Sequence, residues 1–313
     1  MQQSFSRKMT ALALAVSLGL TLGACGGSGE DNPAASASQP VVLTRPVTKL
    51  APDVYQISDY KLVSSYLIIG STKAVFIDAG IGLDSPLPEI KKLTDKPVQL
   101  VLTHGHPDHV GNAYYFNDIW MNPLDEELAK KYNSDVKLIK DYVLSRTPLR
   151  NPGAGHAEYL LSLVPETRPA MFTFKNLTDG MKIDIGDRTL EIIATPGHTS
   201  GSISVLDPKS RLLFTGDALN ASSIIMNKPG GTKDDIAKMA DTLRKMQARS
   251  ADFDKTSPGH DGTVVDKQLI ADFLYLCDGL LAGTLVGAYE VTGIRAGKVV
   301  RYGMAELWYE ADK

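Results

Sequence analysis

The sequence predicts an α/β domain, because apolar runs of strand length alternate along the chain with longer runs of helical periodicity. The chain has 313 residues, of which 43% are hydrophobic, so it is long enough to bury the core of one large domain. Several apolar runs end at a turn that contains Gly and carries His or Asp. Such turns are expected where buried strands end and present polar side chains on loops.

The first 24 residues have the pattern of a secretory signal peptide. Arg7 and Lys8 precede an apolar stretch over residues 9–20, which is too short to span a membrane comfortably. Residues 22–25, Leu-Gly-Ala-Cys, resemble the lipobox of a bacterial lipoprotein, which implies cleavage before Cys25 and acylation of its thiol. A plain signal peptide that happens to end near a cysteine is the alternative.

The residues after the signal are expected to connect a lipid anchor to the folded domain. Residues 25–45 begin with a stretch rich in Gly, Ser and Pro, which is typical of a disordered tether, and the domain is expected over residues 46–313. Gly26 follows the cysteine, and in the resembling proteins this permits sorting to the outer membrane. We therefore expect a cell-envelope protein that faces the periplasm, anchored by lipid to the outer membrane.

The net charge bears on nucleic-acid binding, and the cysteine content bears on disulfide formation. The net charge is −3 and no run of Lys or Arg stands out, so no nucleic-acid partner is expected. Cys25 and Cys277 are the two cysteines of the sequence. If Cys25 carries lipid, Cys277 has no partner for a disulfide within the chain, and its apolar surroundings predict a buried thiol.

Strand-like runs open the domain, and helical patterns follow them. Strands are expected over residues 54–57, 62–69, 74–77, 98–102 and 118–121, and helices over residues 110–116, 125–132 and 135–144. Residues 145–174 break this rhythm with four prolines. We interpret this segment either as an insertion beside the cleft that acts as a substrate lid or as an ordinary packing excursion.

The second half of the domain returns to short strands and ends with two long helices and a strand-rich tail. Strands are expected over residues 181–185, 189–194, 202–206 and 211–215, helices over residues 233–248 and 266–281, and strands within residues 288–308. Methionines recur at helical spacing in the first of these helices and are expected to pack in the core.

A dense cluster of metal-binding residue types follows the run at residues 98–102. Three of the six histidines and an aspartate lie within six positions, as His104, His106, Asp108 and His109. Packed imidazoles crowd one another, and a protonated pair repels. A divalent metal removes this cost, because it binds neutral imidazole nitrogens and an ionised carboxylate.

Four further residues at strand-like ends extend this pattern. His198 and His260 each stand in a Pro-Gly-His triplet, and Asp78 and Asp217 each lie beside Gly after an apolar run. A lone Asp beside Gly is ordinary turn chemistry, but the shared pattern favours one site. His156 follows no strand-like run, so we interpret it as a residue of a loop or a helix start rather than a ligand.

These motifs resemble those of the metallo-β-lactamase superfamily. The His-x-His-x-Asp-His motif stands intact at residues 104–109, and His198, Asp217 and His260 follow in the expected order over a resemblance that spans residues 54–262. The resemblance implies a four-layer αβ/βα sandwich with metals at one edge. It also implies that one metal is held by His104, His106 and His198. The second would be held by Asp108, His109 and His260, with Asp217 bridging the two and Asp78 orienting a ligand.

The donor set indicates a particular chemistry. Imidazoles with carboxylates suit zinc, and two zinc ions about 3.5–4 Å apart can share a water and lower its pKa towards neutrality. The resulting hydroxide attacks a carbonyl or phosphorus, and the other metal or a protonated Asp108 stabilises the leaving group. Iron and manganese are alternative metals, although the flavin-linked di-iron relatives carry Glu at the position of His106.

The resemblance leaves the substrate open. The leading hypothesis is a dinuclear zinc hydrolase that acts on a small ester, lactone, thioester or amide. Zinc β-lactamases commonly have Cys or Ser where this chain has Asp217, and the glutathione-binding signature of hydroxyacylglutathione hydrolase is not recognisable. The alternatives are a β-lactamase, a phosphodiester or sulfate ester hydrolase, an iron oxidoreductase and a non-catalytic, lipid-anchored binding protein.

Overall fold

The computed structural model describes residues 41–309, except residues 134, 170, 227–230, 263, 293 and 294. The predicted signal peptide, Cys25 and most of the predicted tether lie outside these residues. Arg45, the last residue of the predicted tether, is buried, and its Nε donates to Asp59 Oδ1 at 2.8 Å. The folded part therefore includes Arg45 and begins earlier than the expected residue 46, because a buried guanidinium needs this carboxylate partner.

The first half of the chain forms a seven-stranded sheet in simple sequence order. Its strands are β1 (Val47–Ala51), β2 (Val54–Asp59), β3 (Val63–Ile69), β4 (Ala74–Ile77), β5 (Val98–Val101), β6 (Ile119–Met121) and β7 (Lys175–Asn176). The pairs from β1 to β4 are antiparallel, and those from β4 to β7 are parallel. The parallel part matters for the site, because its strands end at one edge of the sheet.

The second half forms a six-stranded sheet that packs against the first. In spatial order its strands are β14 (Val265–Asp266), β13 (Lys255–Pro258), β11 (Leu212–Gly216), β10 (Ile203–Asp207), β9 (Thr189–Ala194) and β8 (Lys182–Asp184). Side chains alternate between two cores: Tyr66 and Ile68 of β3 join residues of the second sheet, whereas Leu67 packs on the opposite face.

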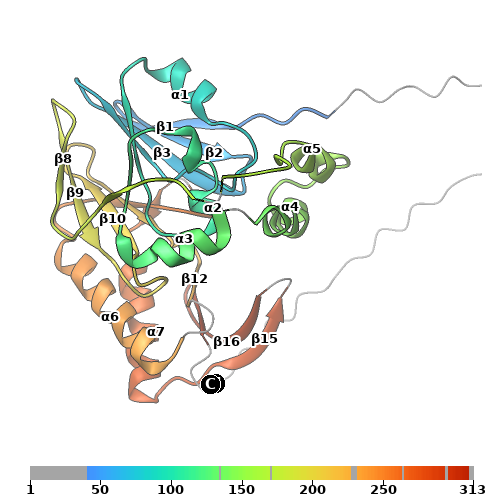
Figure 1. Cartoon of the computed structure of the whole chain (residues 1–313). Coiled ribbons are helices and arrows are strands. Elements are labelled where there is room, and N and C mark those ends of the chain that lie inside the picture. The colour runs from blue at the N-terminus through green and yellow to red at the C-terminus, as the bar shows by residue number, and fades with distance from the viewer. Residues whose placement is uncertain are drawn as a thin grey trace, which may run out of the picture. The chain divides into compact units, whose positions relative to one another are not determined.

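Helices cover the outer face of each sheet. On the first sheet lie α1 (Leu87–Leu93), α2 (Pro107–Val110) and α3 (Glu126–Asn133), and on the second α6 (Lys233–Ala248) and α7 (Leu269–Ala282). Short 3₁₀ helices, η1 (Ala113–Tyr115) and η2 (Pro123–Asp125), flank β6. This order of helix, sheet, sheet and helix confirms the predicted αβ/βα sandwich (Figure 1).

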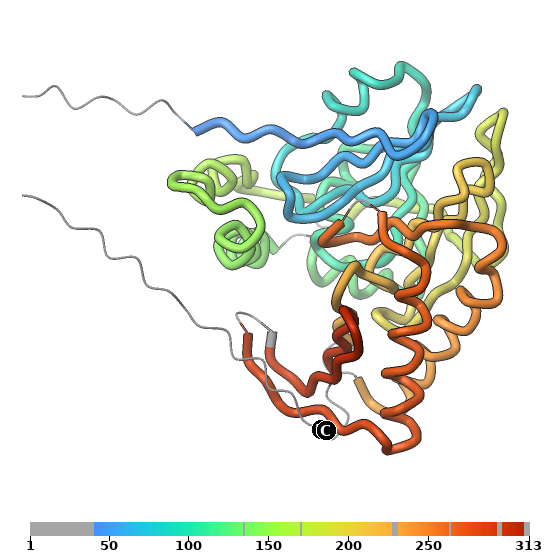
Figure 2. Tube along the Cα trace, turned by 180° about the vertical axis from the view of Figure 1, so that it is seen from behind, coloured from blue at the N-terminus to red at the C-terminus, as the bar shows by residue number. Residues whose placement is uncertain are grey.

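Two further groups of elements extend beyond the sandwich. The helices α4 (Val136–Arg150) and α5 (His156–Ser162) pack on each other and on Tyr60 and Leu62. A third sheet, in the order β12 (Ser223–Ile225), β17 (Ala305–Tyr309), β16 (Arg295–Tyr302) and β15 (Ala288–Thr292), packs on α7. Figures 1 and 2 show α4, α5 and the β15–β16 hairpin on the side away from α6. None of the described helices is long and apolar enough to cross a membrane.

Three predicted helices have different bounds. The helix expected at 110–116 was wrong: α2 begins at Pro107, where proline presets the first turn, and a short η1 replaces its continuation. The α4 helix continues through Pro148 to Arg150, so the predicted break at 145 comes too early. The last long helix begins at Leu269 rather than Asp266, because Asp266 pairs with Lys255 in the sheet.

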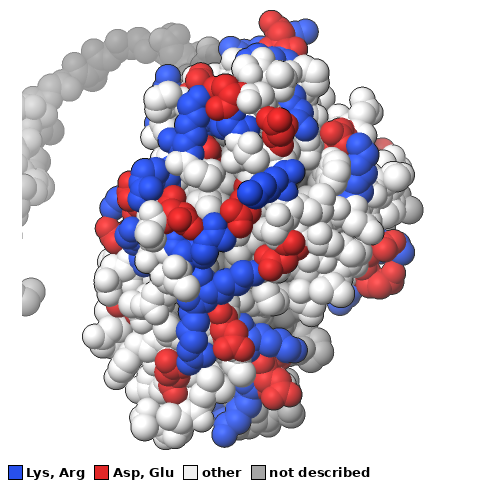
Figure 3. Space-filling view, turned by 90° about the vertical axis from the view of Figure 1, so that its left-hand side faces the viewer, with Lys and Arg blue, Asp and Glu red and all other residues white. Residues whose placement is uncertain are grey.

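Charges on the outer surface are mixed in sign. Figure 3 shows basic and acidic side chains interleaved on the face that carries β8, β9 and α6. Lys245 of α6 lies 2.8 Å from Asp179, and Arg249 lies 2.9 Å from Glu191 of β9. Exposed pairs of this kind contribute little to stability individually, so this face serves mainly as a solvated surface.

Candidate metal centre

Five loops bring the predicted site residues together, and each loop follows a strand. Asp78 follows β4, the cluster at 104–109 follows β5, His198 follows β9, Asp217 follows β11 and His260 follows β13. The strands β4 and β5 run parallel, as do β11 and β13, so their carboxyl ends meet at shared edges. Sequence reasoning anticipated the other four strands but missed β13, because its residues Lys-Thr-Ser-Pro lack an apolar pattern.

Three imidazoles form the first group. His106 Nδ1 lies 2.9 Å from His198 Nε2 and 3.1 Å from His104 Nε2. Burial, followed by repulsion from neighbouring imidazoles, holds the pKa of His104 well below its ordinary value and lowers the pKa of His106 to about 3. Both rings are therefore neutral near pH 7, and their nitrogens can offer lone pairs to one cation.

Asp108, His109 and His260 form the second group. His260 Nε2 lies 3.2 Å from Asp108 Oδ2, and His109 Nε2 lies 3.9 Å from Asp108 Oδ1. Burial alone would raise the pKa of Asp108, but His109 and His260 together hold it well below its usual range. The carboxylate is thus ionised and suited to a cation.

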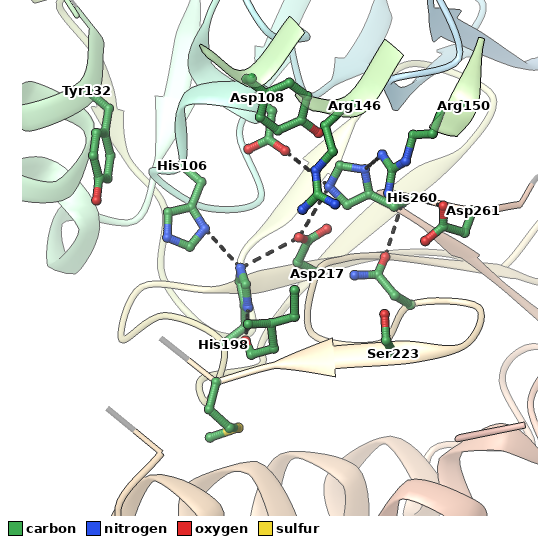
Figure 4. Close-up of a pocket in the computed structure, with 14 residues that line it drawn as sticks. His106, Asp108, Tyr132, Arg146, Arg150, His198, Asp217, Ser223, His260 and Asp261 are labelled. Atoms are coloured by element: carbon green, nitrogen blue, oxygen red, sulfur yellow. Dashed lines mark hydrogen bonds and ion pairs between the residues drawn. The ribbon is translucent and has the colours of Figure 1, made fainter. Parts of the chain in front are cut away.

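Asp217 lies between the two groups. Its Oδ1 is 3.4 Å from His109 Nε2. Its Oδ2 is 3.6 Å from His198 Nε2 and 3.4 Å from His260 Nε2 (Figure 4). Asp217 Oδ1 and His109 Nε2 are both buried and have no hydrogen-bond partner. Two such atoms facing each other are costly without a bound group, and a cation between them would satisfy both. The residues present therefore fit metal binding.

Outer contacts orient the rings. Asp78 Oδ2 lies 2.8 Å from His109 Nδ1 and accepts a hydrogen bond from Thr103 Oγ1, which is the orienting position that the resemblance implied. His198 Nδ1 lies 2.7 Å from the carbonyl of Ile225, and His260 Nδ1 lies 3.1 Å from that of Leu62. The carboxylate beside His109 and the carbonyl beside His198 make the Nδ1 atoms of these two rings donors and leave their inner Nε2 atoms free to bind a metal.

Sequence reasoning missed a carboxylate that holds two of the ligand loops. Asp125, buried at the end of η2, accepts hydrogen bonds from Gly105 N at 2.9 Å, Thr199 Oγ1 at 2.6 Å and Gly201 N at 2.7 Å. These donors flank His104, His106 and His198. In the sequence Asp125 looks like an ordinary helix-start residue, so no local signal separates it from a cap.

The two remaining predictions for reactive side chains concern His156 and Cys277. His156 lies in α5, and its Nδ1 is 2.9 Å from the carbonyl of Asn151, as expected for a residue at a helix start. Cys277 is buried, which confirms the expectation, and burial raises the pKa of its thiol to about 12.

A cavity of about 260 Å³ opens onto the site. One wall of the cavity is apolar or aromatic and is formed by Tyr132, Ile225 and Met226. The other wall is formed by three residues of α4, namely Tyr142, Arg146 and Arg150. The start of the segment expected at 145–174 therefore borders the cleft, while Leu160 and Val164 further along pack into a core. The volume of the cavity suits part of a small molecule rather than a macromolecule.

The fold and the site together define a metal-dependent hydrolase. The chain belongs to the metallo-beta-lactamase superfamily, whose family model matches residues 59–260. Asp78 and all seven predicted ligands fall within the matched range.

Relatives agree with this membership. The chain is 31% identical over 213 residues to the human acyl-coenzyme A thioesterase MBLAC2, an alignment that covers 63% of this chain and 72% of the relative. It is 27% identical to a probable metallo-hydrolase of Methanocaldococcus jannaschii, covering 65% and 89% of the two chains. A solved metallo-beta-lactamase family protein from Thermus thermophilus has the same fold, with a TM-score of 0.53, 18% identity and coverage of 78% and 86%.

Proposed function

We propose that this chain is a dinuclear zinc hydrolase that cleaves acyl thioesters. The observation that carries the proposal is the convergence of five imidazoles and two carboxylates, with Asp217 within 3.6 Å of both groups. The name of the human relative, an acyl-coenzyme A thioesterase, favours thioesters over the other carbonyl substrates that the sequence left open.

The ligand assignment follows the two groups. His104, His106 and His198 would hold one zinc, and Asp108, His109 and His260 the other, with a shared contribution from Asp217. When bound, the two metals would activate a water and polarise the substrate carbonyl. Nitrogen-rich donors with carboxylates favour zinc over the alternatives, iron and manganese.

The protein's own groups position the substrate and handle the leaving group. Tyr132, Ile225 and Met226 offer an apolar wall for an acyl chain. Asp108 lines the same cavity, and its ionised carboxylate would take up a proton from the attacking water and pass it to the departing sulfur. A thiolate needs little such help, because free thiols have a pKa near 8.5. This reaction therefore requires less of Asp108 than amide cleavage would.

A substrate panel tests the proposal. Zinc-loaded protein is offered thioesters, an oxygen ester, a lactone, a β-lactam, a phosphodiester and a sulfate ester, and kcat/KM is measured for each. We expect thioesters to exceed every other class by roughly tenfold or more, and Asp108→Ala to lose turnover. Cleavage of another class at higher efficiency would contradict the thioester assignment, and tight binding without turnover would favour the non-catalytic alternative.

We also propose that the chain is a lipoprotein of the cell envelope. The support is the sequence Leu-Gly-Ala-Cys at residues 22–25 after a basic and apolar leader. Labelling with a radioactive fatty acid should mark the wild-type chain and not Cys25→Ser, and membrane fractionation would then locate it. Equal labelling of the two chains, or no labelling of either, would contradict the anchor.

A further inference from the structure

Two arginines of α4 face the candidate metal centre. Arg146 and Arg150 are four residues apart, so they lie on the same side of the helix, and both line the cavity. Figure 4 shows both guanidinium groups reaching toward the space that Asp108, Asp217 and His260 surround. They differ in how their charges are compensated.

Arg150 is fully engaged by the protein. Its Nη2 lies 3.1 Å from Asp261 Oδ1, and its Nη1 donates to the carbonyl of Leu62 and lies 2.8 Å from His260 Nδ1. Asp261 compensates the charge of the guanidinium, and the contact with His260 ties α4 to the loop of that residue. Arg150 therefore acts as a positioning residue and has little capacity left for a ligand.

Arg146 has no such partners. Within the described part of the chain it makes no ion pair, and its Nε is buried without a hydrogen-bond acceptor. Its guanidinium lies 5.8 Å from the centre of the Tyr142 ring, a weak cation–π contact at most. A half-buried guanidinium with an unsatisfied donor beside a cavity is costly to maintain, so a ligand that satisfies it is expected.

The nearby carboxylates do not fill this role. Asp108 and Asp217 belong to the candidate ligand groups, so bound cations would use their charge. Asp261 is held by Arg150. Among the described residues that line the cavity, Arg146 is thus the arginine whose charge has no carboxylate partner.

We propose that Arg146 forms an anion subsite that binds a carboxylate or phosphate carried by the substrate. The inference rests on the proposed thioesterase function and specifies it: the preferred thioester is anionic and spans from the metal centre to α4. The guanidinium donates to two oxygens of the anion, a geometry that suits both carboxylate and phosphate. The anion can belong to the acyl chain, as in a dicarboxylic half-thioester, or to the thiol part, as in a phosphopantetheine thioester.

Two matched pairs of substrates separate these sources. The first pair is the glutaryl thioester of N-acetylcysteamine and its monomethyl ester, which differ in one acyl-chain charge. The second pair is butyryl-phosphopantetheine and butyryl-pantetheine, which differ in the phosphate. For zinc-loaded protein we expect the charged member of one pair to exceed its neutral partner in kcat/KM by roughly tenfold or more. The pair that shows the preference identifies the source of the anion.

Variants on α4 test which residue is responsible. Arg146→Met keeps an unbranched side chain of high helix propensity but removes the guanidinium, so it should reduce the preference for the charged member to near unity, while Arg146→Lys should keep part of it. Lys140→Ala removes one exposed positive charge from the same helix and serves as the control, since it should keep the full preference. A preference that survives in Arg146→Met, or its absence in both pairs with wild-type protein, would overturn the subsite.

A binding measurement separates this inference from the proposed function. Non-hydrolysable thioether analogues of the same pairs are titrated into zinc-loaded protein by calorimetry. If no thioester is hydrolysed but the charged analogue binds more tightly in an Arg146-dependent way, the proposed function fails and the subsite stands. If thioesters are hydrolysed and neither analogue binding nor kcat/KM depends on Arg146, the subsite fails and the function stands.

Discussion

At the scale of single residues, the site is limited by space as well as by donor chemistry. Gly259 precedes His260, and a Cβ added there would lie 2.4 Å from Asp217 Oδ1 and 2.8 Å from His109 Cε1. The sequence pattern suggested that this glycine serves a tight turn. The structure gives a different reason: any side chain would occupy the space between two candidate ligands.

Gly259→Ala should therefore weaken metal binding. The added methyl group must displace Asp217 or His109, and we expect zinc affinity to fall by roughly tenfold or more, as for other disturbances next to metal ligands. Competition with a chromophoric chelator measures this. Gly262→Ala is the matched control in the same loop, because its nearest neighbours would be 3.6 Å away, at ordinary contact distance. Equal zinc affinity in both variants would refute the steric argument.

At the scale of elements, Asp125 connects a 3₁₀ helix to both halves of the first ligand group. Its carboxylate reaches Gly105 in the loop after β5, and Thr199 and Gly201 in the loop after β9. One charged acceptor thus fixes the relative positions of loops that belong to different sheets. A neutral side chain of similar shape cannot accept all three bonds.

Asp125→Ala should lower both stability and zinc content. Removing the carboxylate leaves the buried amides of Gly105 and Gly201 without an acceptor, which costs about 2 kcal/mol or more in the free energy of unfolding, while Thr199 Oγ1 keeps Ser202 Oγ as a neighbour at 2.7 Å. Urea denaturation and metal analysis of the purified protein measure the two effects. Asp241→Ala removes an exposed carboxylate of α6 and should change the free energy of unfolding by less than about 0.5 kcal/mol. A wild-type midpoint for Asp125→Ala would contradict the bridging role.

Strands with apolar patterns were predictable from the sequence, but a buried polar strand and hydrogen bonds between residues far apart in the sequence were not. The strands β4, β5, β9 and β11 carry apolar runs, so their ends, and with them most candidate ligands, could be placed in advance. Thr256 and Ser257 of β13 are fully buried although polar, because β13 lies between two strands of the sheet. The bond between Asp125 and Gly201 joins residues 76 positions apart, and no local pattern encodes it.

At the scale of the whole molecule, the candidate ligands join the two sheets. His104, His106, Asp108 and His109 follow a strand of the first sheet, whereas His198, Asp217 and His260 follow strands of the second. Each three-residue group that could hold a metal contains members from both sides. Metal binding is therefore expected to stabilise the packing of one half of the sandwich on the other.

Removal of the metals should lower the thermal stability of the full described domain. At free zinc about a thousandfold above its dissociation constant, binding adds about 4 kcal/mol, which corresponds to roughly 10 °C in Tm for a domain of this size. Calorimetry before and after chelation measures the shift. His198→Ala and Asp217→Ala each remove a metal ligand that follows a strand of the second sheet. In both variants we expect a lower metal content and a smaller change in Tm on chelation. An identical Tm with and without zinc in wild-type protein would show that the groups do not join the sheets through a metal.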